Sequence, residues 1–451
     1  MKNIAIIGAG LSGTLLTMNL LQQAGNDSVH IKLIDRRSEQ DLGPAYSTDE
    51  DYLLNVPVEM MGAFSQDPEH FLRWAQERGV SAEKGDYLPR KLYRKYIQAM
   101  LQKAGDGKKE NVTLERIRGE AEDITISDGQ AHVFIRGNGD FITDKVVLAL
   151  GNSPPKHPRT KSQAFVKDKR YFQNPWRVDI FKDLSPNCKI FFIGSGQTMV
   201  DLATGLHKKG HKGKMVAISR RGFLPLSQKK VDPYPSFFDE LQEHSQILPI
   251  FRIVRKHLEI ASEKGLDPRA VIDSLRPHTI AIWMKLLPAE KRRFLRHVFR
   301  YWEIIRSRIP SESEKIIREL QASGQLKILT GKILDIIPTE NALTMQYVSR
   351  DSAVKETESA DMIINCVGPN LDYDQIDEPL IKNLIQKKLI HADPTHLGIN
   401  ALPDGSVLKD DGVPSDMLFT IGLTLKGIVW EALATPEIRV QAENLADKLL
   451  A

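Results

Sequence analysis

The chain has 451 residues, 41% of them apolar, and a formal net charge of +4. This length can bury large cores and indicates two or three domains, while the mild positive charge suits an anionic ligand but lacks the basic clustering of a nucleic-acid partner. The two cysteines, Cys188 and Cys366, lie far apart, which excludes a disulfide framework, a Cys-x-x-Cys redox pair and a cysteine-only metal site. We expect no metal, and any redox chemistry must come from a bound cofactor.

The first elements along the chain form a strand, a glycine turn, a helix and a second strand. An apolar run at 3–7 precedes the sequence GAGLSG at 8–13. Residues 14–24 have helical periodicity, and a second apolar run at 29–34 ends at Asp35. This order and spacing predict the βαβ unit of a dinucleotide-binding domain.

Each glycine of the turn has an expected role. Gly8 permits the tight turn, Gly10 leaves room for a pyrophosphate, and Gly13 lets helix and strand pack closely. The free N–H groups at the start of the helix, around Ser12, would bind the phosphates. Asp35 is placed to accept hydrogen bonds from ribose hydroxyls. The alternative is a glycine turn that only packs.

The apolar segment 4–21 follows Lys2 and so resembles a signal peptide or membrane anchor. Its internal glycines and polar residues, and the lack of a small-residue cleavage site, favour a folded segment instead. No other stretch approaches the roughly 20 apolar residues that cross a bilayer. We therefore expect a cytoplasmic protein without a transmembrane segment.

The region after the first unit is predicted to be rich in strands. The expected strands are 112–114, 121–126, 131–135 and 145–150. The last of them leads into Gly151, and a similar late strand at 362–367 leads into Gly368. Each glycine can close over a cofactor or can simply mark the exit of a strand.

A second, degenerate dinucleotide unit begins near residue 189. A strand at 189–193, the sequence GSGQTM at 194–199, a helical pattern and a strand at 214–218 follow one another. Met199 replaces the third glycine, while the phosphate-facing Gly194 and Gly196 remain. The second strand leads into Ser219, Arg220 and Arg221. Arginines at this position suit a ribose 2′-phosphate and favour NADP(H), with NAD(H) as the alternative; they can also be plain surface arginines.

Residues 237–320 have an almost wholly helical pattern. One apolar stripe consists of Phe294, Leu295, Val298, Trp302, Ile305 and Ile309. The opposite face carries Lys291, Arg292, Arg293, Arg296, Arg300 and Arg306. We expect the stripe to pack on the body of the protein with a solvated basic face; the alternative is peripheral contact with a membrane surface.

Taken together, the chain resembles the FAD/NAD(P)-binding oxidoreductases, bacterial flavoproteins related to flavin-dependent and N-hydroxylating monooxygenases. The matching segments are spread over nearly the full length: the turn at 8–13, GPAYS at 43–47, LLNVP at 53–57, HFLRW at 70–74, LPR at 88–90 with Tyr93 and Tyr96, LALGN at 148–152, GSG at 194–196, SRRG at 219–222, NCVGP at 365–369, and Trp430-Glu431 with PEIR at 436–439.

The resemblance implies an α/β fold with two Rossmann-like domains and a helical insertion. The implied division is an FAD-binding domain at 1–160 and 366–451, an NAD(P)-binding domain at 161–236 and 320–365, and a helical insertion at 237–319. Gly422 would close over the flavin, but Leu423 stands where many relatives carry an acid that binds the ribityl chain. The flavin-monooxygenase pattern FxGxxxHxxx(Y/F) is absent between the two turns.

The expected cofactors are FAD and NADP(H). The residues expected to contact them are Gly8, Gly10, Ser12, Gly13, Asp35, Arg36, Ala45, Tyr46, Asn55, Gly151, Gly194, Gly196, Ser219, Arg220, Arg221, Gly368 and Gly422. Asn55 is also the candidate catalytic residue, as a hydrogen-bond donor to the flavin or its peroxide. Its alternative role is to cap the bend at 56–57.

The leading hypothesis is an FAD-dependent enzyme that takes hydride from NAD(P)H and passes electrons to oxygen, oxygenating an amine or another soft nucleophile. The first alternative is an NAD(P)H reductase that feeds a quinone or a protein acceptor. The second is a non-catalytic, redox-responsive dinucleotide-binding protein. Trp430 and Glu431 either flank the substrate or only begin a C-terminal helix. The identity of the small-molecule substrate and the oligomeric state stay open.

Overall fold

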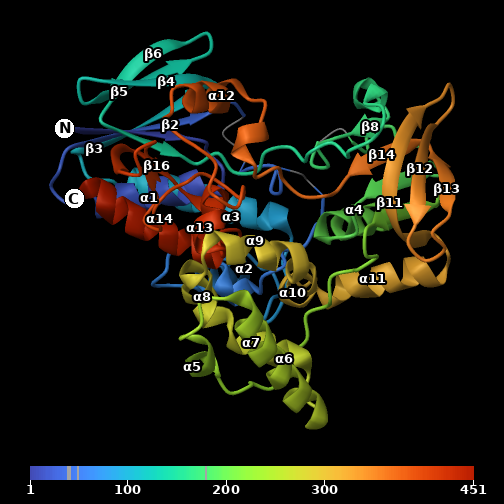
Figure 1. The fold of residues 1–451 in the computed structure, drawn as a ribbon. Coiled ribbons are helices and arrows are strands. Elements are labelled where there is room, and N and C mark those ends of the chain that lie inside the picture. The colour runs from blue at the N-terminus through green and yellow to red at the C-terminus, as the bar shows by residue number, and fades with distance from the viewer. Residues whose placement is uncertain (38–41, 48–49, 178–179) are drawn as a thin grey trace.

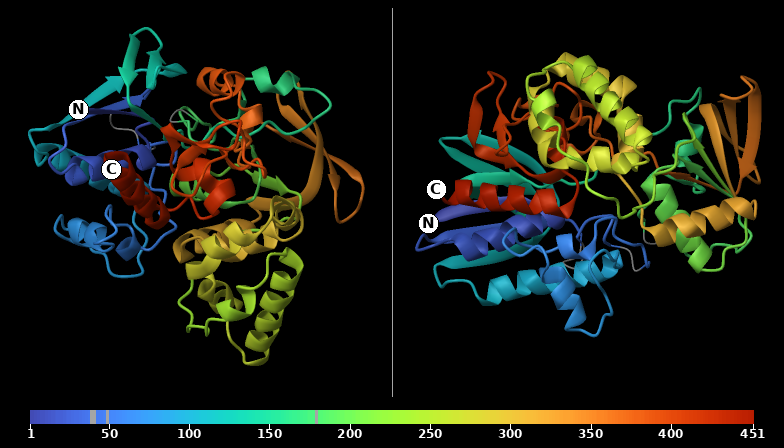
Figure 2. Two further views of the ribbon diagram at one scale, coloured as in Figure 1. Left: turned by 60° about the vertical axis from the view of Figure 1, so that its left-hand side comes forward. Right: turned by 90° about the horizontal axis from the view of Figure 1, so that it is seen from below.

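The structure is a computed structural model that describes residues 1–37, 42–47, 50–177 and 180–451. Its two large sheets lie at opposite ends of the molecule, and a group of helices lies below them in Figure 1. The two views of Figure 2 show the same separation, with the helical group beside the space between the sheets. Among the described residues, no helix is long and apolar enough to cross a membrane.

The first sheet is built from both ends of the chain. Across the sheet its strands are β15 (Ser406–Leu408), β16 (Pro414–Thr420), β7 (Lys145–Leu148), β1 (Lys2–Ile7), β2 (Val29–Asp35) and β3 (Val112–Arg118). Only β15 pairs antiparallel. Because side chains alternate along a strand, Ile4 and Ile6 pack on one face while Ala5 and Ile7 pack on the other. Both faces are therefore covered, as expected for a parallel sheet.

Three helices cover one face of this sheet. They are α1 (Leu11–Gln23), α3 (Arg90–Asp106) and α14 (Thr435–Leu450). The opposite face carries α12 (Pro379–Gln386) and the antiparallel strands β4 (Ala121–Ser127), β5 (Gln130–Ile135) and β6 (Gly139–Thr143). The two chain ends lie side by side in Figures 1 and 2, where the Lys2 ammonium donates to the Leu450 carbonyl.

The second sheet has a parallel centre and an antiparallel extension. Across it run β13 (Lys355–Ala360), β12 (Leu343–Ser349), β11 (Leu326–Pro338), β10 (Met215–Ser219), β9 (Ile190–Ile193), β14 (Met362–Asn365) and β8 (Tyr171–Phe172). Helices α4 (Gln197–Lys208) and α11 (Ser311–Ala322) pack on one face. Met199, in place of the third glycine, is fully buried in this core.

Strand β6 was not predicted from the sequence. Its residues are mostly exposed and include Gly139 and Asp140, so the segment lacks the apolar alternation that marks a half-buried strand. It forms because β5 offers a free edge, with Val133 paired to Phe141. The other expected strands of this region are present, and β3 extends to Arg118.

The insertion between β10 and α11 is helical, as predicted. Its helices are α5 (Phe238–Leu241), α6 (Ile247–Glu263), α7 (Pro268–Ser274), α8 (Thr279–Lys285), α9 (Pro288–His297) and α10 (Phe299–Arg306). The remaining helices are α2 (His70–Gln76) and α13 (Lys426–Val429). The apolar stripe is not one continuous helix, because Val298 separates α9 from α10 and Ile309 lies beyond α10 in the core of the second sheet.

The expectation of a solvated basic face on the insertion holds for Arg292, Arg293, Arg296 and Arg300, which are exposed, but not for Lys291 and Arg306, which are partly buried. Lys291 donates to the Gly427 carbonyl at 3.2 Å, and Arg292 donates to the Pro394 carbonyl at 2.9 Å. Arg306 pairs with Glu431. Lys291, Arg292 and Arg306 thus contact polar groups of the C-terminal part of the chain, and so help to fix the insertion beside the first sheet.

Arg308 gives a stability prediction for the insertion. Its guanidinium is 2% exposed and pairs with both carboxylate oxygens of Asp273 at 2.9 Å. Asp273 is 29% exposed and also pairs with Arg276 at 3.1 Å, so removal of Arg308 leaves its charge partly compensated. The cost is then that of lost charged hydrogen bonds, about 1.5–3 kcal/mol. Arg308→Ala should therefore lower the free energy of unfolding by about 2 kcal/mol in urea titrations. Arg255→Ala, which removes an exposed pair with Glu259, is the control, and an equally small effect of both changes would contradict the prediction.

Candidate functional site

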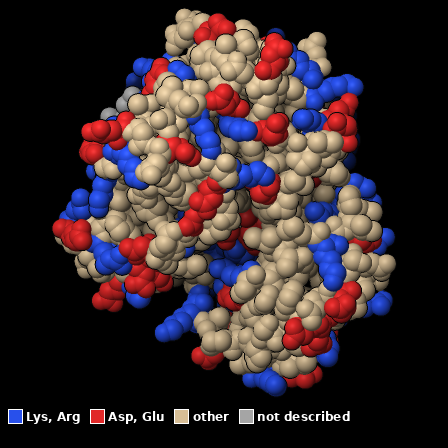
Figure 3. All heavy atoms as spheres, turned by 90° about the vertical axis from the view of Figure 1, so that its left-hand side faces the viewer, with Lys and Arg blue, Asp and Glu red and all other residues tan. Residues whose placement is uncertain are grey.

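A single cavity of about 620 Å³ runs from the first glycine turn to the helical insertion. Its walls come from the start of α1, the segments around residues 43–46 and 54–57, the start of α4, the C-terminal part of α10 and the segment 430–438. Figure 3 shows a hollowed face on which Lys and Arg side chains are interspersed with Asp and Glu. An elongated cavity lined by a few polar groups is the usual form of a cofactor site.

The first glycine turn has the geometry that its sequence predicts. Gly8 has φ +110°, and a Cβ there would lie 2.2 Å from the Ala149 carbonyl oxygen. A Cβ on Gly13 would lie 1.9 Å from the Gly8 carbonyl oxygen, so helix and strand are in direct contact. Gly10 is different, because its nearest atom, the Leu42 carbonyl oxygen, would be 3.7 Å away. Gly10 thus faces open space in the cavity, where a pyrophosphate can approach the backbone.

Asp35 is fixed at the end of β2 by two partners. One carboxylate oxygen accepts from the Ala9 N–H at 2.7 Å, and Arg37 donates to both oxygens at 3.0 Å. Burial raises the pKa of Asp35, but the hydrogen bonds and charge of Arg37 outweigh it, so the pKa lies below its ordinary value. Asp35 is therefore ionised and in place as an acceptor on the cavity wall.

Many of the residues singled out from the sequence meet on this one cavity. The lining includes Gly8, Gly10, Ser12, Asp35, Arg36, Ala45, Tyr46, Asn55, Gly151 and Gly368. The backbone brings the last two together, because Ser153 and Asn370 form a bridge between their segments. Gly422 lies behind the wall, where its Cβ would be 2.3 Å from the Ser12 hydroxyl oxygen, and the neighbouring Leu423 reaches the cavity.

Asn55 projects toward the second sheet's domain. Its amide donates to the side-chain carbonyl of Gln197 at 2.9 Å, and both residues line the cavity. Asn55 thus contacts the first residue of α4 across the space between the two sheets. This contact was not foreseen, since the two residues are 142 positions apart in the chain.

The second glycine turn repeats the first in a separate place. A Cβ on Gly194, with φ +108°, would lie 2.8 Å from the Cys366 carbonyl oxygen, whereas Gly196 has no atom within 4 Å. The Ser195 hydroxyl donates to the Ser219 hydroxyl at 2.8 Å and so joins the turn to the end of β10. Gly194, Ser195 and Gly196 do not line the first cavity.

Arg221 contacts the helical insertion beside this second turn. Its guanidinium donates to the Tyr301 hydroxyl at 2.7 Å and lies 4.9 Å from the centre of that ring. Arg220 is exposed at the same strand end. The two arginines and Ser219 therefore form one group near Gly196, outside the first cavity.

The far end of the first cavity is charged and lies against the insertion. Arg306 donates to both oxygens of Glu431, at 3.0 and 3.3 Å, and lies 3.8 Å from Glu437. Burial, reinforced by Glu431, raises the pKa of Glu437. One carboxylate oxygen of Glu437 is buried and has no hydrogen-bond partner among the described residues. Burial also lowers the pKa of Lys426, whose ammonium lies 5.4 Å from the Trp430 ring centre.

Trp430 closes this end of the cavity. It has φ 62°, an uncommon backbone conformation for a tryptophan, and ends α13 rather than starting the C-terminal helix. Its ring packs 4.4 Å from that of Trp283 in the insertion. Of the two interpretations of Trp430 and Glu431, the cavity wall fits the geometry, because α14 begins only at Thr435.

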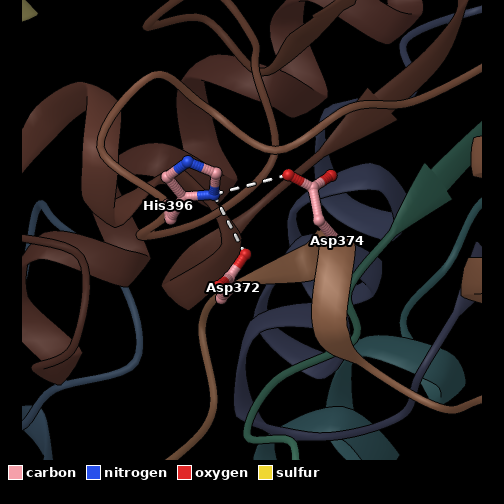
Figure 4. Close-up of side chains that lie close together, drawn as sticks. All are labelled: Asp372, Asp374 and His396. Atoms are coloured by element: carbon pink, nitrogen blue, oxygen red, sulfur yellow. Dashed lines mark hydrogen bonds and ion pairs between the residues drawn. The ribbon is translucent and has the colours of Figure 1, made fainter.

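A second polar cluster joins the two segments that connect the sheets. In Figure 4 the His396 imidazole points at both carboxylates, with Nδ1 3.0 Å from Asp372 and 3.4 Å from Asp374. Lys156 donates to the other oxygen of Asp372 at 2.9 Å. The two carboxylates and the imidazole offer possible metal-ligand atoms within 4.8 Å of one another. Because the Lys156 ammonium already neutralises Asp372, we interpret the cluster as a structural contact between connecting segments.

Three side chains of the site were missed by the sequence reasoning. Arg37, not its neighbour Arg36, binds Asp35; Arg36 pairs with Glu120 at 3.1 Å. Arg90 and Asp201 form a buried ion pair on the cavity wall. The only available signal was that Arg90 belongs to the LPR segment of the family resemblance.

The comparisons with known proteins agree with this geometry. Residues 5–153 match a family model described as FAD-NAD(P)-binding, so the chain carries an FAD/NAD(P)-binding domain of the kind predicted. A search of curated proteins gives no match. The family match covers the first turn, Asp35, Asn55 and the strand that leads into Gly151.

Solved structures share the fold over the whole chain. Ornithine hydroxylase from Pseudomonas aeruginosa, in its reduced form, has 16% identity and a TM-score of 0.67, with 100% of this chain and 99% of that chain covered. An ornithine N-hydroxylase from Kutzneria sp. 744, with reduced FAD, NADP⁺ and L-ornithine, has 12% identity and a TM-score of 0.62 over 100% and 99%. Bacillithiol disulfide reductase from Staphylococcus aureus has 10% identity and a TM-score of 0.60 over the same shares. These likenesses confirm the predicted two-domain fold, and the family match supports the predicted cofactor class for residues 5–153.

Proposed function

We propose that this chain, with its FAD/NAD(P)-binding domain at residues 5–153, is an NADPH-dependent flavoprotein that oxygenates an amine or another soft nucleophile. One observation carries the proposal: a single cavity joins the glycine turn, Asn55 and a charged end that the helical insertion encloses. A cofactor and a small substrate can therefore occupy neighbouring parts of the same space.

The residues present fit FAD along the first part of the cavity. Gly10 leaves its backbone open to a pyrophosphate, the N-terminus of α1 supplies free N–H groups, and ionised Asp35 can accept from ribose hydroxyls. Bound FAD would take hydride from NADPH and supply the electrons that oxygen chemistry needs. For NADPH, Gly196 and the arginines after β10 would hold the pyrophosphate and the 2′-phosphate.

The two cysteines indicate whether the electrons pass to oxygen or to a disulfide. Cys366 is buried, and burial raises its pKa; Cys188 also has a raised pKa. Neither is the low-pKa thiol that disulfide exchange requires, and they are far apart in the sequence. We therefore favour transfer to oxygen over reduction of a disulfide, despite the shared fold with a disulfide reductase.

The charged end suits an amine. An amine must lose its proton before its nitrogen can act as a nucleophile, and a carboxylate with a raised pKa is a suitable acceptor. Glu437 lines the cavity and has such a pKa, and one of its oxygens is buried without a hydrogen-bond partner among the described residues. The Arg306–Glu431 pair holds the wall beside it, and the buried Trp430 ring packs on Trp283 at the same end.

Mixing purified protein with NADPH and oxygen tests the proposal. The proposal expects oxygen uptake that increases with a primary amine such as ornithine or cadaverine, together with a hydroxylated amine as product. Flavin reduction by NADPH without peroxide or oxygenated product would refute it. Reduction of a soluble quinone without oxygen uptake would select the reductase alternative.

Glu437→Gln provides a prediction on substrate binding. The amide keeps the size of the side chain but cannot accept a proton, so we expect KM for the amine to rise on the order of tenfold, as for loss of a charged hydrogen bond. In the wild type, activity should increase with pH as Glu437 ionises, at a pKa raised by burial, and the variant should lose this step. Glu443→Gln on the same helix, whose carboxylate contacts Ser65 and Gln66, is the matched control. An unchanged KM and pH profile in Glu437→Gln would remove this residue from the substrate site.

A further inference from the structure

The helix that begins at the second glycine turn contacts the first domain through one line of residues. Gln197, Asp201 and Gly205 are spaced four apart on α4, so they lie on the same side of the helix. Gln197 accepts from Asn55 at 2.9 Å. A Cβ on Gly205 would lie 2.7 Å from the Tyr52 ring, so the glycine permits this close approach.

The centre of this line is an ion pair buried between the domains. Arg90 donates to Asp201 at 2.7 Å, and the two side chains are 9% and 7% exposed. Arg90 also donates to the Leu53 carbonyl at 3.1 Å and lies 5.3 Å from the Trp176 ring centre. The Leu53 carbonyl therefore holds the guanidinium on its own side, while the Trp176 ring and Asp201 contact it from the second sheet's side; among the described residues, Asp201 is the acid that pairs with it.

We propose that this α4 contact, formed by Gln197, Asp201 and Gly205 against Asn55, Arg90 and Tyr52, orients the second glycine turn so that NADPH can deliver hydride to FAD. Its residues are positioning residues for the reduction of the flavin. The inference rests on the proposed function, because it concerns the same hydride transfer.

The geometry gives the reason. The NADPH turn and the FAD cavity belong to different sheets, and hydride transfer requires the reacting atoms to be held about 3–3.5 Å apart. Because Gly196 is the N-cap residue of α4, any rotation of α4 on the first domain moves the turn itself. A misplacement of about 1 Å can reduce a rate on the order of a hundredfold.

The contact also predicts a pH dependence. Burial raises the pKa of Asp201 to about 6, although the charge and hydrogen bond of Arg90 lower it. The titratable groups that face it are Arg90 on α3, Tyr52 and Cys366, the last two with raised pKa values. Asp201 is thus ionised and paired above pH 6 and becomes protonated below it. The pKa of Asp201 in the folded protein exceeds its ordinary value, so protonation is easier in the folded state than in the unfolded state. Acidification therefore breaks the ion pair, but protonation of Asp201 itself does not lower the stability of the fold.

Two variants test the contact by different routes. Asp201→Asn removes the charge and keeps the shape, and Gly205→Ala places a methyl group against the Tyr52 ring without changing any charge. Glu312→Gln is the matched control, since Glu312 pairs with Lys208 of α4 at the surface. FAD content, reduction by dithionite, and the anaerobic rate of flavin reduction at saturating NADPH are measured from pH 5 to 8.

Both variants should retain FAD and dithionite reduction but be reduced by saturating NADPH about 10- to 100-fold more slowly, while the control matches the wild type. The wild-type rate should fall as pH decreases through about 6, and the Asp201→Asn rate should not. A wild-type rate in either variant, or loss of FAD from both, would overturn the inference.

Hydrogen exchange separates this inference from the proposed function. Amides of residues 52–57 and 197–205 should exchange faster in both variants than in the wild type. If NADPH fails to reduce the wild-type flavin, the proposed function fails while faster exchange still supports the α4 contact. Unchanged exchange in both variants would overturn the contact itself.

Discussion

Gly13→Ala is expected to produce a protein without bound FAD and with reduced stability. The added Cβ would lie 1.9 Å from the Gly8 carbonyl oxygen and 3.2 Å from Ile6, so α1 must move away from the sheet. Such overpacking costs about 1–3 kcal/mol or more, and the shift also displaces the N–H groups at the start of the helix. Flavin absorbance after gel filtration and the thermal midpoint measure the two effects.

Gly10→Ala separates cofactor binding from packing. A Cβ there meets no atom closer than 3.7 Å, and the residue has φ −69°, so the apoprotein should keep its thermal midpoint. The methyl group would occupy the space expected for the pyrophosphate, and FAD should be lost. Gly105→Ala, with no atom within 4 Å, is the control. Full FAD content in Gly10→Ala would show that the cofactor does not pass this glycine.

The double change of Arg220 and Arg221 to alanine should abolish the preference for NADPH. A hydrogen bond to a charged group contributes about 1.5–3 kcal/mol, so KM for NADPH should rise on the order of 10- to 100-fold per lost contact. KM for NADH, which lacks the 2′-phosphate, should stay the same. Steady-state kinetics with both cofactors measure the ratio.

Tyr301→Phe is the control for the double variant. Arg221 also donates to the Tyr301 hydroxyl, so the double variant loses a contact to the insertion as well as the proposed phosphate contact. Tyr301→Phe removes only that contact and should leave the cofactor preference unchanged. An equal rise of KM for NADH and NADPH in the double variant would contradict a 2′-phosphate site at these arginines.

Local features of the fold could be predicted because they depend on local physics. The roles expected of Gly8 and Gly13 follow from their place between a strand and a helix, and the structure shows the same close approaches. Apolar runs marked the buried strands, since both faces of a parallel sheet are covered. Strand β6 was not predicted because most of its residues are exposed and only its pairing with β5 makes the segment a strand.

Contacts between residues that are far apart in the chain could not be predicted from the sequence. The sequence places Arg36 and Arg37 equally near Asp35, and only the turn of the chain after β2 brings Arg37 to the carboxylate. The side chains that hydrogen-bond to those of Asn55 and Arg90, Gln197 and Asp201, lie more than a hundred residues away. The contacts of Lys291 and Arg292 could not be foreseen, because their acceptors, the Gly427 and Pro394 carbonyls, are backbone groups of the C-terminal part of the chain.

The absorption spectrum of the purified protein, recorded without oxygen before and after addition of NADPH, tests the central claim most directly. We predict flavin absorption in the purified protein that NADPH bleaches and that air restores. A protein without flavin, or a bound flavin that dithionite reduces and NADPH does not, would contradict the assignment of FAD to the cavity at Gly10 and of NADPH to the turn at Gly196.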